Sequence, residues 1–251
     1  MIDNQMYPLL FALLPGKSQT IYTRFLEKLK STMEDLHLQL NPTVLFMDFE
    51  SAAQNAAKAA FPGITLKGCF FHYTQCIWRK TQQLGLQTHY RDNEDIHRLI
   101  RRAAVLPLIR IEDYWFNAWN DLKDVNLPVE TTTFTDYVTT QWVEGDRNIW
   151  NQFDNDGPRT TNTLEGWHSK LKKRIPSSHP NIYLFIRVLK EVQAANDVSL
   201  IQHAAGGLPA QKRRCYRVLN ERLVHLKTLP DDGQIDYINY GDRATYLLHM
   251  E

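Results

Sequence analysis

The chain has 251 residues, of which 43% are hydrophobic and 23% charged, and its formal net charge is +1. These proportions are typical of one large globular domain or two small ones, and they exclude a disordered tail, a collagen-like repeat and a coiled coil. Because positive and negative charges nearly cancel, any nucleic-acid-binding surface is confined to local patches. The sequence contains no apolar run of 18 residues, so no membrane span is predicted. Three cysteines are too few for a disulfide framework, which favours a reducing compartment.

The first half of the chain predicts strands and helices in alternation. Residues 1–5 lack the basic and apolar regions of a secretory signal. The predicted elements that follow are a buried strand over 7–14, a helix over 18–38 with Ser18 as its N-cap, a strand over 43–47, a helix over 51–60 and a strand over 64–72. Strands without polar alternation that are separated by helices indicate βαβ units and a parallel sheet.

From about Tyr73 onwards the chain predicts mostly helix, because apolar residues recur at helical spacing. The helical segments are expected at 96–109, 114–122, 134–150, 162–175 and 182–203. Residues 204–207, with the sequence Ala-Ala-Gly-Gly, predict a flexible break. The tail from about Leu229 predicts a loop with a short extended piece over 237–240.

Asp48 is the first candidate functional residue, since it directly follows an apolar strand of the predicted parallel sheet. In open α/β sheets, ligands bind at the carboxyl ends of the strands, and a carboxylate there can hold a hard cation such as Mg²⁺. The alternative is that Asp48 or Ser51 only caps the helix that follows. Position alone does not decide between the two interpretations.

Glu165 is the second candidate and lies near the start of a predicted helix. Its spacing also has an ordinary explanation, because Asn162 as N-cap with Glu165 three residues later resembles a capping box. On spacing alone, the capping box is the favoured interpretation.

Cys69 and His72, followed by Cys76, are the third candidate feature, since cysteine and histidine are common zinc ligands. A structural zinc site needs four ligands, and no second Cys/His pair follows at a suitable spacing, so zinc is not expected. Alternatively, Cys69 is a small buried hydrophobic residue and His72 is a helix cap or a surface residue.

Local clusters of basic residues are the fourth feature. Lys170, Lys172, Lys173 and Arg174 lie on one predicted helix, Arg79 and Lys80 on another, and Arg98, Arg101 and Arg102 on a third. Such clusters can neutralise DNA phosphates. The alternative is that they are solvated helix faces, with the helical tryptophans in the core.

Three motifs in a specific order resemble the Mutator-like element (MULE) transposase domain. They are the segment 8–17 (PLLFALLPGK), the motif Met47-Asp48-Phe49-Glu50-x-Ala52, and Gly68-Cys69-Phe70-Phe71-His72 followed by Gln75, Arg79 and Lys80. The resemblance covers about residues 6–91 and extends more weakly over 161–168.

The resemblance implies an α/β fold: a truncated ribonuclease H-like core with a small, mostly parallel sheet, a large helical insertion and a helical C-terminal part. The expected boundaries are 1–91 for the partial core, 92–160 for the helical insertion, 161–205 for the helices that carry the final Glu, and 206–251 for the C-terminal helix and tail.

Members of that family use an Asp-Asp-Glu triad, of which Asp48 matches the second Asp and Glu165 the final Glu. The resemblance therefore implies that both are catalytic ligands of Mg²⁺ (or Mn²⁺), and that Cys69 and His72 organise the site. It implies DNA cleavage and strand transfer, with transposon ends and target DNA as partners held by the basic helix faces. A membrane is not expected as a partner, and a homo-oligomer is possible. The expected location is nuclear in a eukaryote and otherwise intracellular.

The sequence departs from the family at the first Asp, because no Asp-Gly-Thr-Phe-like motif occurs before the segment 7–14, and Asp3 is no substitute. We therefore expect the chain alone to be inactive, as a fragment of a gene model or a decayed or co-opted copy. We also expect the strand over 7–14 to pair in parallel with 43–48 in a three-stranded sheet. The alternatives are an inert, transposon-derived nucleic-acid-binding or regulatory protein and a folded remnant without a DNA function.

Overall fold

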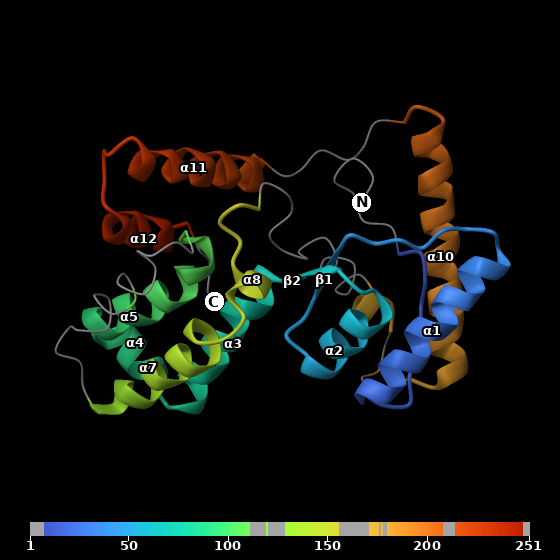
Figure 1. Cartoon of the computed structure of the whole chain (residues 1–251), viewed down its shortest axis with the longest axis horizontal. Helices are drawn as coiled ribbons and strands as arrows, with labels where there is room; N and C mark the ends of the chain where they lie inside the picture. The colour runs from blue at the N-terminus through green and yellow to red at the C-terminus, as the bar shows by residue number, and fades with distance from the viewer. Residues whose placement is uncertain are drawn as a thin grey trace. The chain divides into compact units, whose positions relative to one another are not determined.

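The computed structural model describes residues 8–110, 119, 129–155, 171–175, 177, 180–207 and 214–247. The chain forms two compact units (Figure 1). The smaller unit comprises Met1–Gly16 and Thr160–Arg213, and the larger unit comprises Lys17–Arg159 and Arg214–Glu251.

A βαβ unit lies near the start of the larger unit. Strand β1 (Val44–Met47) pairs in parallel with β2 (Thr65–Gly68), and helix α2 (Ser51–Ala60) connects them. The register runs from Val44 opposite Thr65 to Met47 opposite Gly68. These findings confirm the prediction of a strand that ends just before Asp48, a helix over 51–60 and a parallel sheet.

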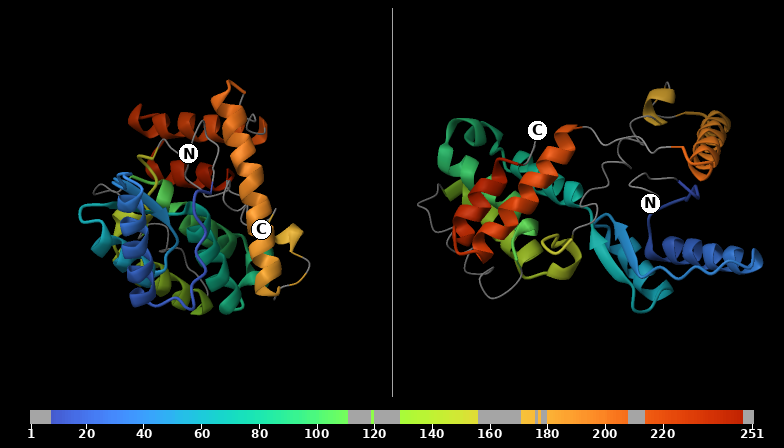
Figure 2. Two further views of the ribbon diagram at one scale, coloured as in Figure 1. Left: turned by 90° about the vertical axis from the view of Figure 1, so that its right-hand side faces the viewer. Right: turned by 90° about the horizontal axis from the view of Figure 1, so that it is seen from above.

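Helix α1 (Gln19–Asp35) packs against α2 (Figure 2). Ser18 is its N-cap, as predicted, since the Ser18 Oγ accepts a hydrogen bond from the Ile21 amide at 3.4 Å. The helix ends three residues before the predicted end, and His37 then adopts a left-handed conformation with φ of 57°.

The strand predicted over 7–14 is wrong, since residues 8–14 form no strand and the sheet of the described residues has two strands instead of three. Its apolar side chains are not buried: Leu9 is 83% exposed, and Leu10, Leu13 and Leu14 are exposed as well. The expectation that this segment pairs with 43–48 is wrong for the same reason. An apolar segment becomes a buried strand only where a neighbouring element packs against its side chains and a neighbouring strand has backbone groups available for hydrogen bonds.

The strand predicted over 64–72 is too long at its C-terminal end. Pairing stops at Gly68 because β1 ends opposite it, at Met47. Cys69 is then the N-cap of helix α3 (Phe70–Gln83), so His72 lies in the first turn of a helix instead of at the end of a strand. This difference decides which way His72 faces.

The remaining helices of the larger unit surround its hydrophobic core. They are α4 (Gln87–Asp92), α5 (Glu94–Val105), η1 (Leu106–Leu108), η2 (Val129–Thr131), α7 (Thr132–Val138), η3 (Thr139–Val143) and α8 (Arg147–Trp150). Helix α3 contacts both α5 and α7 (Figure 1). Tyr73, Ile100, Phe134 and Trp142 lie in this core. The predicted helical segment 114–122 lies outside the described residues except for Trp119, which is helical and buried.

Two helices complete the larger unit at its C-terminal end, α11 (Arg214–Asp231) and α12 (Tyr237–Thr245). The extended piece predicted over 237–240 is therefore wrong, and the loop predicted from Leu229 is limited to residues 232–236. Asp236 caps α12, and its Oδ1 accepts a hydrogen bond from the Asn239 amide at 2.7 Å. The buried Tyr240 donates a hydrogen bond to the Leu108 carbonyl at 2.6 Å. Contacts with α5 and η1 thus stabilise a helix whose own sequence favours a turn.

In the smaller unit, helix α10 (Ile182–Ala204) confirms the helix predicted over 182–203. Asn181 caps it, accepting a hydrogen bond from the Tyr183 amide at 2.8 Å. The predicted break at 204–207 is also confirmed, with Gly206 at a φ of 86° that glycine adopts without strain. Of the helix predicted over 162–175, the structure describes only its end, where residues 171–174 are helical.

Among the described residues, no helix combines the length and the apolar character that a membrane span requires.

Candidate functional site

The candidate site is the loop of residues 48–50, which joins β1 to α2 and is called the acidic loop below. Its central residue, Phe49, turns into the core, where its ring centroid lies 4.9 Å from that of Trp142 and 6.5 Å from that of Tyr73. The ring also covers Gly68, so close that a Cβ atom at Gly68 would lie 2.3 Å from it. Phe49 therefore anchors the loop between the carboxylates of Asp48 and Glu50.

The end of β2 is held in place from the other side. The buried Gln152 donates a hydrogen bond from its Nε2 to the Gly68 carbonyl at 2.7 Å, and its Oε1 accepts one from Asn155. A segment 84 residues further along the chain thus fixes the strand end from which Cys69 and α3 start. Sequence reasoning missed Gln152, because no local motif indicates a hydrogen bond across such a separation.

The structure brings Asp48 and His72 together. The Oδ1 atom of Asp48, whose side chain is 61% exposed, lies 2.8 Å from the His72 Nδ1 atom. The contact is an ion pair when the imidazole ring is protonated. Because α3 begins at Phe70, its first turn places His72 beside the end of β1.

This contact changes the charge of the site at neutral pH. Asp48, and after it the hydrogen bond with the Cys69 side chain, raises the pKa of His72 to about 10 against the opposing effect of burial. His72 is therefore an imidazolium at neutral pH. Cys69 is a buried thiol at the start of α3, so Cys69, His72 and Asp48 form one cluster.

Glu50 is held on the other side of the acidic loop by the start of α1. The Tyr22 hydroxyl donates a hydrogen bond to Glu50 Oε1 at 3.0 Å, and Lys17 Nζ lies 3.9 Å from Oε2. Partial burial, followed by the nearby Glu50 carboxylate, raises the pKa of Tyr22. Tyr22 is a second residue that sequence reasoning missed; the alternation of strand and helix, which predicts that α1 packs near β1, was the available signal.

The predicted phosphate-binding residues divide into exposed and structural ones. Arg79 is exposed on α3, and Lys172, Lys173 and Arg174 are exposed in the smaller unit. The ammonium group of Lys80 lies 5.1 Å from the centre of the Tyr137 ring. Glu165 and Lys170 lie outside the described residues.

Arg101 and Arg102 have structural partners instead of facing outward to phosphates. Arg101 donates hydrogen bonds to the Thr245 carbonyl and the Tyr90 hydroxyl, and Arg102 forms a bidentate ion pair with Asp242. The interpretation as a phosphate-binding face and the alternative of a solvated face are therefore both wrong for this pair, because both side chains hold α12.

Oxygen donors such as the Asp48 carboxylate suit a hard cation, Mg²⁺ or Mn²⁺, better than zinc. Within the part of the chain that the structure describes, no three His, Cys, Asp or Glu side chains come together as a metal site. The donor chemistry of Asp48 fits the implied cation, and Glu165, the other expected ligand, lies outside that part.

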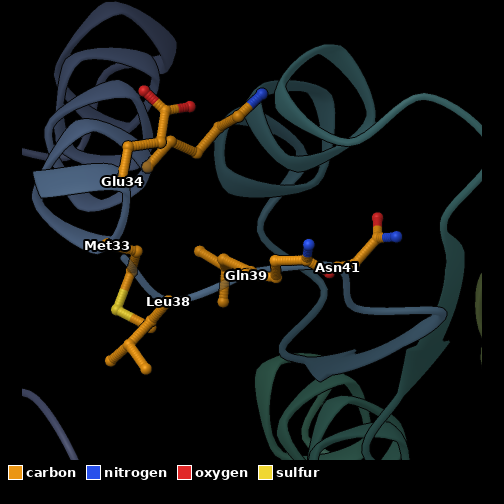
Figure 3. A pocket seen from close by; sticks show the side chains of 7 residues that line it. Met33, Glu34, Leu38, Gln39 and Asn41 are labelled. Atoms are coloured by element: carbon orange, nitrogen blue, oxygen red, sulfur yellow. The ribbon is translucent and has the colours of Figure 1, made fainter. Parts of the chain in front are cut away.

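A pocket of about 400 Å³ opens at the end of α1 and along the chain that leads into β1 (Figure 3). Its lining is formed by Lys30, Met33, Glu34, Leu38, Gln39, Leu40 and Asn41. These residues precede the start of β1, whereas the acidic loop follows its end. The pocket therefore has no part in the Asp48 cluster.

We expect the Asp48→Asn substitution to lower the pKa of His72 from about 10 towards its ordinary value of 6.5, because it removes the largest cause of the shift. NMR titration of the imidazole Cε1 proton measures this change. Because the folded-state pKa is raised, the ion pair contributes its full stabilisation below pH 6.5, and this is lost as the pH rises through about 10.

The matched control is Glu50→Gln, two residues away, since Glu50 contacts Tyr22 and Lys17. It should leave the pKa of His72 near 10. A wild-type imidazole that titrates near 6.5 would show that the ion pair is absent.

Residues 2–76 match the family model of the MULE transposase domain. The match confirms the resemblance over a segment that contains Asp48, Cys69 and His72, and it indicates a transposase-family function. No curated protein and no solved structure matches the chain.

Proposed function

We propose, from the MULE transposase domain that residues 2–76 match, that this chain binds DNA and supplies two carboxylates, Asp48 and Glu165, to a divalent metal site for DNA transposition. The observation that carries the proposal is the placement of Asp48: it is exposed, at the carboxyl end of a parallel strand, on a loop that the core anchors. Ligand sites of α/β sheets occur at this edge.

A Mg²⁺ or Mn²⁺ ion held by such carboxylates would act as a Lewis acid for phosphoryl displacement on DNA. The chain's own residues orient the site. Phe49, packed over Gly68 and against Trp142, fixes the backbone on both sides of its ring. The ion pair with His72 fixes the orientation of the Asp48 carboxylate and neutralises its charge.

The proposed site needs one more carboxylate. Of the three acids of the family pattern, the sequence supplies Asp48 and Glu165. We propose that the chain by itself binds DNA without cutting it, with Arg79, Lys80, Lys172, Lys173 and Arg174 as phosphate contacts, together with Lys170. A ribonuclease H-like core and a nuclear location belong to the same proposal.

Fluorescence anisotropy with a labelled DNA duplex tests the binding. We expect the affinity of the full chain to fall by about tenfold or more between 50 and 200 mM salt, because phosphate contacts release counterions. The combined charge-removing substitutions Lys172→Gln, Lys173→Gln and Arg174→Gln should weaken binding, whereas Glu191→Gln, which also alters an exposed residue of the smaller unit, should not. Absence of binding at low salt would contradict the proposal.

A plasmid-nicking assay with Mg²⁺ or Mn²⁺ separates this proposal from its alternatives. We expect no nicking by the chain alone. Robust nicking that Asp48→Asn abolishes would show that the chain holds a complete catalytic site, and the proposed need for a further carboxylate would be wrong.

A catalytically inert, transposon-derived DNA-binding or regulatory protein is the second candidate. The ion pair with His72 favours it, because the imidazolium neutralises the Asp48 carboxylate when no metal is bound. Under this alternative, Asp48→Asn and Glu165→Gln leave every DNA-dependent function unchanged.

A further inference from the structure

Helix α10 carries apolar side chains on two opposite faces. Val188, Leu189 and Val192 are buried on one of them. At about 100° per residue, the exposed Tyr183 and Ile201 lie on the other side of the helix. The exposed face of α10 therefore combines charged residues with an aromatic and an aliphatic side chain near the two ends of the helix.

The exposed face follows a regular line along the helix. Tyr183 and Ile201, 80% and 68% exposed, are 18 residues apart, which is about five turns, so they point in the same direction. Lys190 and Asp197 follow Tyr183 at intervals of seven residues. Each interval turns the side-chain direction by only about 20° around the helix axis, so both residues lie close to this line. The line thus carries an aromatic, a positive, a negative and an aliphatic residue in this order. We call these four residues, Tyr183, Lys190, Asp197 and Ile201, the α10 stripe.

We propose that the α10 stripe binds the same stripe of a second copy of this chain, with the two helices antiparallel. Tyr183 and Ile201 are both nine residues from Val192, so a two-fold axis near Val192 places Tyr183 of each copy opposite Ile201 of the other. The same axis brings Lys190 of each copy within about one turn of Asp197 of the other. Ile186 and Val198, which flank the line, add apolar area on its two sides.

Charge complementarity selects a second copy in this orientation. In a parallel pair, Lys190 would meet Lys190 and Asp197 would meet Asp197, and like charges at close distance are unfavourable. In the antiparallel pair, each lysine is near an aspartate, and the apolar ends of the stripe meet each other. The surface is therefore self-complementary, as a two-fold interface requires.

The size of the contact sets the expected affinity. The helix has 23 residues and is about 35 Å long, so one helix pair is at the small end of specific interfaces. We expect a reversible dimer with a dissociation constant on the order of micromolar.

Sedimentation equilibrium of the full chain at about 1 to 100 μM tests the proposal. We expect a monomer–dimer equilibrium that either Lys190→Glu or Asp197→Lys weakens by about tenfold or more. The double substitution restores each pair with reversed sign, so it should recover dimerisation to within about threefold. Arg98→Glu on α5 makes the same charge change as Lys190→Glu at an exposed residue of the larger unit, and it should leave the equilibrium unchanged.

A chain that remains monomeric at about 100 μM would overturn the proposal. A dimer that the double substitution fails to restore would overturn the antiparallel pairing. The substitution Tyr183→Glu identifies the other occupant: if it lowers the melting temperature of the monomer and leaves association unchanged, the rest of the same chain covers the stripe, and the proposal is wrong.

Discussion

Replacing Arg102 by alanine is expected to lower the free energy of unfolding by about 3 kcal/mol. The Arg102 guanidinium is almost completely buried, and its Nε and Nη2 atoms lie 2.5 and 2.6 Å from the two carboxylate oxygens of Asp242. Removing it leaves a partly buried carboxylate without its partner and loosens α12 from α5. Urea unfolding followed by circular dichroism measures the loss.

Two controls identify the cause of this loss. Lys58→Ala breaks an ion pair with Asp146 that is 3.9 Å long and half exposed on both sides, and it should cost about 0.5 kcal/mol or less. The combined substitution Arg102→Met and Asp242→Leu removes both charges, so it should recover part of the stability. A loss below about 1 kcal/mol for Arg102→Ala would show that α12 does not depend on this pair.

Replacing Trp142 by alanine is expected to lower the free energy of unfolding by about 4 kcal/mol. Its indole is 3% exposed, and its ring centroid lies 4.6 Å from that of Tyr73 and 4.9 Å from that of Phe49. The substitution leaves a cavity beneath the acidic loop. The change in the urea midpoint, followed by circular dichroism, measures it.

The matched control is Trp142→Phe, which keeps an aromatic ring against Phe49 and Tyr73. We expect it to cost less than half as much as the alanine substitution, because most of the cavity stays filled. Equal losses for the two variants would mean that the aromatic packing on Phe49 contributes nothing, and the proposed anchoring of the acidic loop would be wrong.

The βαβ unit could be predicted from the sequence because its signals are local. An apolar strand ends just before Asp48, an alanine-rich helix ends before Pro62 and Gly63, and the next strand starts within two residues. The N-cap Ser18 and the end of α10 were predicted for the same reason. In each case the residues that determine the element are its own.

Elements that depend on distant partners could not be predicted. Helix α12 contains Gly241 and polar residues, and contacts of Tyr240 and Asp242 with η1 and α5 stabilise it. The apolar segment 8–14 looks like a strand but is largely exposed. Its composition cannot show that the sheet of the described residues ends at two strands.

The candidate site shows the same division. Asp48 and His72 could be identified from motifs, and the structure places them 2.8 Å apart. The residues that hold them, above all Gly68 beneath the Phe49 ring and Gln152 on the Gly68 carbonyl, follow only from tertiary packing. Their assignment as metal ligands and site organisers stays a prediction.

The most direct test of the account is the paramagnetic broadening of backbone NMR signals by Mn²⁺ in the full chain. If Asp48 is a ligand of a divalent cation, broadening should centre on residues 48–50 and the start of α3, and Asp48→Asn should abolish it. The Arg98→Gln variant, altered at an exposed residue of α5 without adding a carboxylate, should give the wild-type pattern. Broadening centred elsewhere, or unchanged by Asp48→Asn, would contradict the claim that the end of β1 is a metal site.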